Sequence, residues 1–145
     1  MNGGEMIVPG AGQFAGVSVF PILMSGEPII VTNTASGSEL EINGDCVSRF
    51  RFDHATIPLD ARVTMQARMK TDGNGYIYAE IQELAGGYVG DSEISTSDYT
   101  ATDLIESDDF REQLIGMEQD FYLSVWLTGG ASKGYIYSII LVIER

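Results

Sequence analysis

Residues 63–84 constrain the possible folds more than any other part of this sequence. In residues 63–70, apolar side chains at 63, 65, 67 and 69 alternate with polar ones, and residues 76–84 alternate in the same way. Strict alternation is typical of a β-strand with one buried face. The intervening residues 71–75 contain Asp-Gly and Asn-Gly, which adopt positive φ angles at low cost. The pattern predicts a β-hairpin.

The same alternation of strand and turn signals continues through most of the chain. Further strands are predicted at residues 14–24, 29–34, 39–43, 46–53, 91–97 and 99–105, with a second hairpin at 121–144. Pro21 cannot donate a ladder hydrogen bond, so the first run is an edge strand or two strands meeting at a bend before a turn at 25–28. Residues 135–144 are apolar on both faces, which indicates a central strand or one covered by a partner.

Helix signals are nearly absent. Residues 107–116 contain the one expected helical turn, with Ser107 as N-cap and Gly116 as its end, although a loop that places Phe110 in the core fits equally. Residues 1–16 are glycine-rich and are expected to form an extended arm, and residues 17–145 a single domain. We predict an all-β fold, an antiparallel two-sheet jelly-roll-like sandwich with at most one short helix, rather than a closed barrel.

Charge and composition exclude several functions. The formal net charge of −13 argues against a nucleic-acid partner and against an anionic membrane surface. No apolar run is long enough to span a bilayer, and the first ten residues lack the features of a secretory signal. We therefore expect a protein that works in the cytoplasm of the cell that makes it, or that leaves by another route such as lysis. The single cysteine, Cys46, cannot form an intramolecular disulfide.

Catalytic motifs are also missing. The sequence has no phosphate-binding loop, Gly-x-Ser-x-Gly, His-Glu-x-x-His or Cys-x-x-Cys, so we predict that the protein is not an enzyme. His54 is the only histidine and is expected in a loop or at a strand end. No cofactor is expected except a structural calcium ion, for which the candidate ligands are Asp72 with Asn74 and Asp91 with Glu93. The alternative is that these residues only form solvated turns.

The tyrosines give the one binding pattern in the sequence. Gly-Tyr-Ile-Tyr occurs twice, at residues 75–78 and 134–137, and places Tyr76 with Tyr78 and Tyr135 with Tyr137 on single strand faces. Tyrosine is common in half-buried strands, which explains the pattern structurally. The functional interpretation is that these four tyrosines and Trp126 stack on sugar rings.

Several strand patterns carry a resemblance to a known family. They are residues 63–70, 78–81, 90–97, 122–125 and 140–144, with Ser107 and Phe110 between them. The segment from about Ala61 to Arg145 resembles a jelly-roll β-sandwich module of phage virion proteins, of the capsid decoration (cement) or tail-fibre type, and is similar also to carbohydrate-binding modules. The resemblance implies a module that binds a surface, often as a homotrimer within a virion.

Two classes of function follow. The first is a non-enzymatic virion protein, most simply a capsid decoration protein, that binds other virion proteins and its own copies by adhesion. The second is a carbohydrate-binding, receptor-binding module of a tail fibre or an extracellular protein, with the tyrosines and Trp126 as its ligand-binding residues. Deletion of residues 1–13 is expected to abolish assembly in the first case and to leave sugar binding intact in the second.

Overall fold

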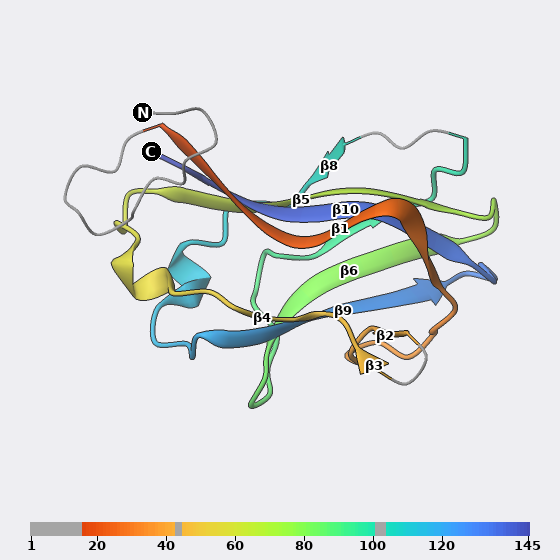
Figure 1. Ribbon diagram of the computed structural model, residues 1–145, viewed down its shortest axis with the longest axis horizontal. Helices are drawn as coiled ribbons and strands as arrows, with labels where there is room; N and C mark the ends of the chain where they lie inside the picture. Colours follow the sequence, from red (N-terminus) through yellow and green to blue (C-terminus); the bar gives the residue numbers. More distant parts are fainter. Residues whose placement is uncertain (1–15, 43–44, 101–103) are drawn as a thin grey trace.

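A computed structural model describes residues 16–42, 45–100 and 104–145, and its strands form two stacked antiparallel sheets (Figure 1). The first sheet has the order β1-β10-β5-β8, with strands β1 (Val17–Val31), β10 (Gly134–Glu144), β5 (Arg62–Thr71) and β8 (Leu104–Glu106). The second has the order β4-β9-β6-β7, with strands β4 (Arg49–Arg51), β9 (Asp120–Thr128), β6 (Tyr76–Glu83) and β7 (Ile94–Thr96). A small separate pair joins β2 (Glu41–Ile42) and β3 (Asp45–Cys46). The predicted all-β sandwich is confirmed.

The strand order is that of a jelly roll. The eight sandwich strands pair in a nested way: β1 with β10, β4 with β9, β5 with β8, and β6 with β7. The pairs β5–β10 and β6–β9 then join these strand pairs into two four-stranded sheets. Most connections along the chain therefore cross from one sheet to the other, as in other double-sheet jelly rolls.

Both predicted hairpins are wrong, although their strands are correct. β5 and β6 lie in different sheets, as do β9 and β10, so each connection is an arch between the layers. Alternation identifies the buried face of a strand, but it does not show which strand pairs with it. The turn residues do not distinguish the two cases either, because an arch also needs positive φ, here at Gly73 (φ 108°) and Gly75 (φ 73°).

The two arches lie against each other at one end of the sandwich. Asp72 joins them: its Oδ2 accepts hydrogen bonds from the backbone N–H groups of Ser132 and Lys133, both at 3.1 Å, and from the Ser132 hydroxyl. The Asp72 N–H donates in return to Lys133 O at 3.1 Å. These donors stabilise the ionised carboxylate, so the pKa of Asp72 lies below its usual value, with the Ser132 hydroxyl as the main cause.

The predicted helix at residues 107–116 is reduced to a single 3₁₀ turn, Glu112–Leu114. Ser107 Oγ instead accepts a hydrogen bond from Met65 N at 2.9 Å, and Asp109 Oδ1 accepts one from Val63 N at 2.9 Å. These side chains therefore satisfy the backbone of β5 beyond the short strand β8. Phe110 is fully buried, which confirms the alternative of a loop that places this ring in the core.

The edge strand β1 is longer than expected. The turn predicted at residues 25–28 is wrong, because β1 continues through these residues. Register shifts between Pro21 and Leu23 and between Met24 and Ile29 accommodate the irregular residues within one strand. Its place at the sheet edge, predicted from Pro21, is confirmed, as is the central place of β10. The strand predicted at 99–105 begins only at Leu104; residues 101–103, and the predicted arm except Gly16, lie outside the described residues.

The core fills the space between the sheets. Phe52 is buried and Phe50 half-buried, and the centre of the Phe50 ring lies 5.7 Å from that of Phe121, on which it stacks. His54 begins a 3₁₀ turn (His54–Thr56), is itself buried, and places Nε2 within 3.0 Å of Met117 O and 2.9 Å of Glu118 O. Two carbonyl acceptors require a proton on Nε2, so this histidine ties two loops together.

Candidate functional site

The outer face of the β4-β9-β6-β7 sheet presents a row of polar and aromatic cross-strand pairs. Every second residue of β6 and β9 points into the core, where Ile77, Ala79, Ile81, Leu123, Val125 and Leu127 are buried. The residues between them form the outward pairs Tyr78–Trp126, Glu80–Ser124 and Gln82–Tyr122. Only the register of β6 on β9 brings these side chains together.

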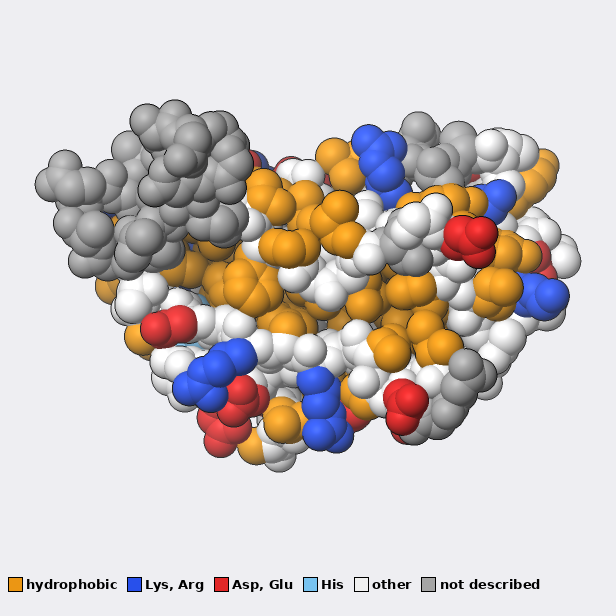
Figure 2. Space-filling view, viewed as in Figure 1, with side chains coloured by type: hydrophobic (Ala, Val, Ile, Leu, Met, Phe, Trp, Pro, Cys, Tyr) orange, Lys and Arg blue, Asp and Glu red, His pale blue; other side chains and the backbone are white. Residues whose placement is uncertain are grey.

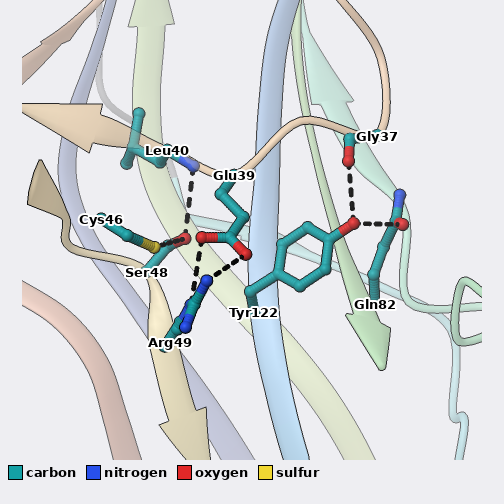
Figure 3. Close-up of polar contacts among 8 residues, drawn as sticks. All are labelled: Gly37, Glu39, Leu40, Cys46, Ser48, Arg49, Gln82 and Tyr122. Atoms are coloured by element: carbon teal, nitrogen blue, oxygen red, sulfur yellow. Dashed lines mark hydrogen bonds and ion pairs between the residues drawn. The ribbon is translucent and has the colours of Figure 1, made fainter. Parts of the chain in front are cut away.

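Residues 33–40, which we call the strap, run along β9 and reach over this face. Leu127 N donates to Asn33 O at 2.8 Å, and Asn33 Nδ2 donates to Val125 O at 3.1 Å. At the other end of the strap, Glu39 forms an antiparallel bridge with Ser124. Between these ends the strap crosses β9 towards β6, so that Gly37 lies near Gln82 (Figure 3).

An ion pair ties the strap to β4. Arg49 Nε donates to Glu39 Oε2 at 3.1 Å and Nη2 donates to Oε1 at 2.9 Å, a bidentate arrangement (Figure 3). The pKa of Glu39 is lowered, first by this hydrogen-bonded guanidinium. The Arg49 side chain is 57% exposed, so the ion pair mainly fixes the position of the strap on β4 and adds little stability. Next to it, Ser48 Oγ accepts a hydrogen bond from Leu40 N at 3.3 Å.

A pocket of about 640 Å³ opens beside the ion pair. It is lined by residues 30–33 at the end of β1, residues 38–41 and Arg49. Its volume suits a small molecule, but charged and polar groups dominate the lining, in contrast to the apolar walls of most small-molecule sites.

A chain of polar contacts links the strap to the largely buried Glu80 on β6. The Tyr122 hydroxyl oxygen lies 2.8 Å from Gly37 O and 2.7 Å from Gln82 Oε1, and Gln82 Nε2 lies 2.9 Å from Glu80 Oε1. Glu80 is only 9% exposed, and burial raises the pKa of its carboxyl. Burial also raises the pKa of Tyr122, with Glu39 and Glu80 adding to the effect.

The five predicted aromatic ligands do not form one site. Tyr78 stacks on Trp126, with ring centres 5.3 Å apart and an interplanar angle of 6°. The ring centres of Tyr76 and Tyr78 are 6.1 Å apart. Trp126 is only 7% exposed and Tyr78 is half-buried, so Tyr76, at 46%, is the open ring of this group. Tyr135 and Tyr137 are on β10 in the other sheet, half-buried, with Lys70 Nζ 5.3 Å from the centre of the Tyr135 ring.

The predicted calcium ligands lie in two separate loops. Asp72 and Asn74 are in the β5–β6 arch, where Asp72 already accepts the hydrogen bonds described above. Asp91 and Glu93 are in the β6–β7 connection, where Asp91 Oδ2 accepts a hydrogen bond from Gln113 Nε2 at 3.2 Å. Among the described residues, no group of three or more His, Cys, Asp or Glu side chains could hold a metal ion.

Sequence reasoning missed the most connected residues of this face. Glu39, Arg49, Glu80, Gln82 and Tyr122 stand on three strands and the strap, and no motif joins them. The one available signal was the polar alternation of residues 78–82 and 122–126, which marks an outward face without showing which strands are neighbours.

Comparisons with known proteins add no family. No protein-family model matches the chain, and no curated protein matches it. Within the described residues, no helix is long and apolar enough to cross a membrane. Inferences about function therefore depend on the fold and on the surfaces described here.

Proposed function

We propose that this chain is a non-enzymatic structural protein of a virion, a capsid decoration (cement) protein or a related virion component. It acts by adhesion between subunits, as a homo-oligomer that we expect to be a trimer. The jelly-roll strand order supports the proposal, because this architecture is common in viral capsid proteins, although lectin domains share it. Fold alone does not define function, so the proposal depends on a surface.

The surface that carries the proposal is the outer side of β1. Val17, Val19, Met24 and Ile30 point away from the core and are 56%, 39%, 69% and 54% exposed. Within the 15 residues of β1 only Glu27 is charged, in a chain whose composition is 20% charged. A long, largely apolar edge strand with a single charged residue favours association with another chain. Apolar side chains also gather across the middle of Figure 2, over β1 and between the edge strands β1 and β4.

The test is the solution mass of the full chain by light scattering, followed by binding to capsids. We expect a trimer, or a monomer that binds a capsid lattice, and we expect Met24→Lys combined with Ile30→Lys to abolish either form of association. Leu59→Lys is the matched control, because Leu59 is 68% exposed and lies outside β1. A wild-type monomer that binds no capsid, or a double variant that associates normally, would contradict the proposal.

A second candidate function, glycan binding, has one specific observation in its favour. Tyr76 is exposed beside Tyr78, which itself covers Trp126, so the three rings form a small aromatic surface on the outer face. A glycan screen with and without calcium tests this function. Tyr76→Ala should then remove binding, whereas Tyr88→Ala, at a tyrosine that is 65% exposed in the β6–β7 connection, should retain it.

A further inference from the structure

The contacts around Tyr122 contain more acceptors than protons. The hydroxyl has one proton, yet two oxygens, Gly37 O and Gln82 Oε1, lie within 2.8 Å of it. With the Gln82 amide nitrogen turned towards Glu80, one of these two close oxygen pairs has no proton between its atoms. A close oxygen pair without a proton is repulsive, so this arrangement lacks one hydrogen bond.

A neutral Glu80 removes the conflict. Rotating the Gln82 amide by half a turn exchanges its oxygen and nitrogen and moves no other group. A protonated Glu80 then donates to Gln82 Oε1, Gln82 Nε2 donates to the Tyr122 oxygen, and the Tyr122 hydroxyl donates to Gly37 O. All three contacts become hydrogen bonds, and the chain of donors runs in one direction from Glu80 to the strap.

We propose that Glu80, Gln82 and Tyr122 form a proton-controlled clamp, which holds the strap on β9 while Glu80 is protonated and loosens it when Glu80 ionises. On ionisation the proton leaves to solvent and the Gln82 nitrogen turns to the carboxylate. The single proton of Tyr122 then serves either Gly37 or Gln82, so the strap contact at Gly37 is weakened.

The surroundings of Glu80 favour the neutral acid. Its carboxyl is largely desolvated, and Glu93 from the β6–β7 connection places a further negative charge nearby, both of which raise its pKa. On the strap side the nearest charged groups are Glu39 and Arg49, which are paired with each other. The clamp therefore opens at a higher pH than that at which an exposed glutamate ionises.

The test follows the Glu80 carboxyl by NMR in the full chain, together with hydrogen exchange of the Leu127 amide, which donates to Asn33 in the strap. The exchange rate at each pH is divided by that of Glu80→Gln, a permanently neutral donor, which cancels the intrinsic effect of pH on exchange. We expect this ratio to rise about fivefold as Glu80 ionises, the factor that corresponds to one hydrogen bond of about 1 kcal/mol.

Two further variants separate the clamp from a general loss of structure. Tyr122→Phe should leave the Leu127 amide weakly protected at every pH while Glu80 still titrates. Glu93→Gln should move the transition to lower pH without removing it, because it deletes one neighbouring charge. A Glu80 that titrates together with the exposed glutamates, or a ratio that stays constant as Glu80 ionises, would overturn the proposal.

Discussion

Replacing Gly75 by alanine should separate the two arches of the jelly roll. Gly75 has a φ of 73°, and a Cβ atom at this position would lie 1.9 Å from Thr128 O, 2.8 Å from Gly129 C and 2.9 Å from Gly129 O. These contacts are with backbone atoms of the opposite arch, where no rotamer change can provide space. Since real Cβ atoms do not approach other atoms within 3.0 Å, the two arches must move apart by more than 1 Å.

The expected cost has two parts. A positive φ costs a residue other than glycine about 1–2 kcal/mol. Separating the arches breaks the first hydrogen bonds of the β6–β9 ladder, at the Tyr76–Thr128 pair, each worth about 1 kcal/mol, and loosens the packing of Ile77 on Leu127. The positive φ and two lost hydrogen bonds together cost about 3–4 kcal/mol, a large share of the 5–15 kcal/mol typical of a domain.

Gly130→Ala is the matched control for this prediction. Gly130 also has a positive φ, 93°, but a Cβ atom there would have no neighbour within 4 Å. It should therefore lose only the conformational part, about 1–2 kcal/mol. Urea unfolding followed by the fluorescence of the single tryptophan, Trp126 on β9, measures both variants. Two free energies of unfolding within about 1 kcal/mol of each other would refute the reasoning.

Three further changes test other parts of the fold. Asp72→Asn should lower the urea midpoint at pH 7, because a carboxyl with a lowered pKa stabilises the fold at pH values above its unfolded pKa. The difference from wild type should vanish as the pH falls through the folded pKa of Asp72. A difference that does not depend on pH would be evidence against this origin. Phe110→Ala should cost about 3–5 kcal/mol of unfolding free energy, whereas Ile115→Ala, at a residue 61% exposed, should stay within about 0.5 kcal/mol; equal losses would contradict the buried position of the ring. His54→Ala should cost about 2 kcal/mol in the same assay, because it leaves two partly buried carbonyl groups without a donor, and no loss would exclude that role.

The sequence was informative about strands and uninformative about their neighbours. Alternation at residues 63–70 and 76–84 correctly predicted buried Met65, Met69, Ile77 and Ile81, because each strand has one face in the core. The pairing of those strands was predicted wrongly, since residues 71–75 can close a hairpin or cross between layers. What decides between them is the nested pairing of the first strand with the last, a long-range property that no local window contains.

The region around Ser107 shows the same limit for capping signals. A Ser followed by acidic residues is typical of a helix N-terminus because its side chain satisfies free backbone N–H groups. Ser107 and Asp109 do accept hydrogen bonds from backbone N–H groups, but the donors Met65 and Val63 lie on β5, more than 40 residues earlier. Asp109 Oδ1 also accepts a local hydrogen bond, from Arg111 N at 3.1 Å. The chemistry of the signal was interpreted correctly, whereas its donor was assigned to the wrong element.

The outer face of the second sheet depends on register even more strongly. Gln82 and Tyr122 are opposite each other only because β6 and β9 pair in one register, and a slip of β6 by one residue would turn the Gln82 side chain into the core, away from Tyr122. Gly37 then adds a third element, the strap, 85 residues away from Tyr122 in sequence. Burial of Glu80 beside these groups is a consequence of the same assembly. A raised carboxyl pKa therefore identified this face only after the fold had placed three distant segments together.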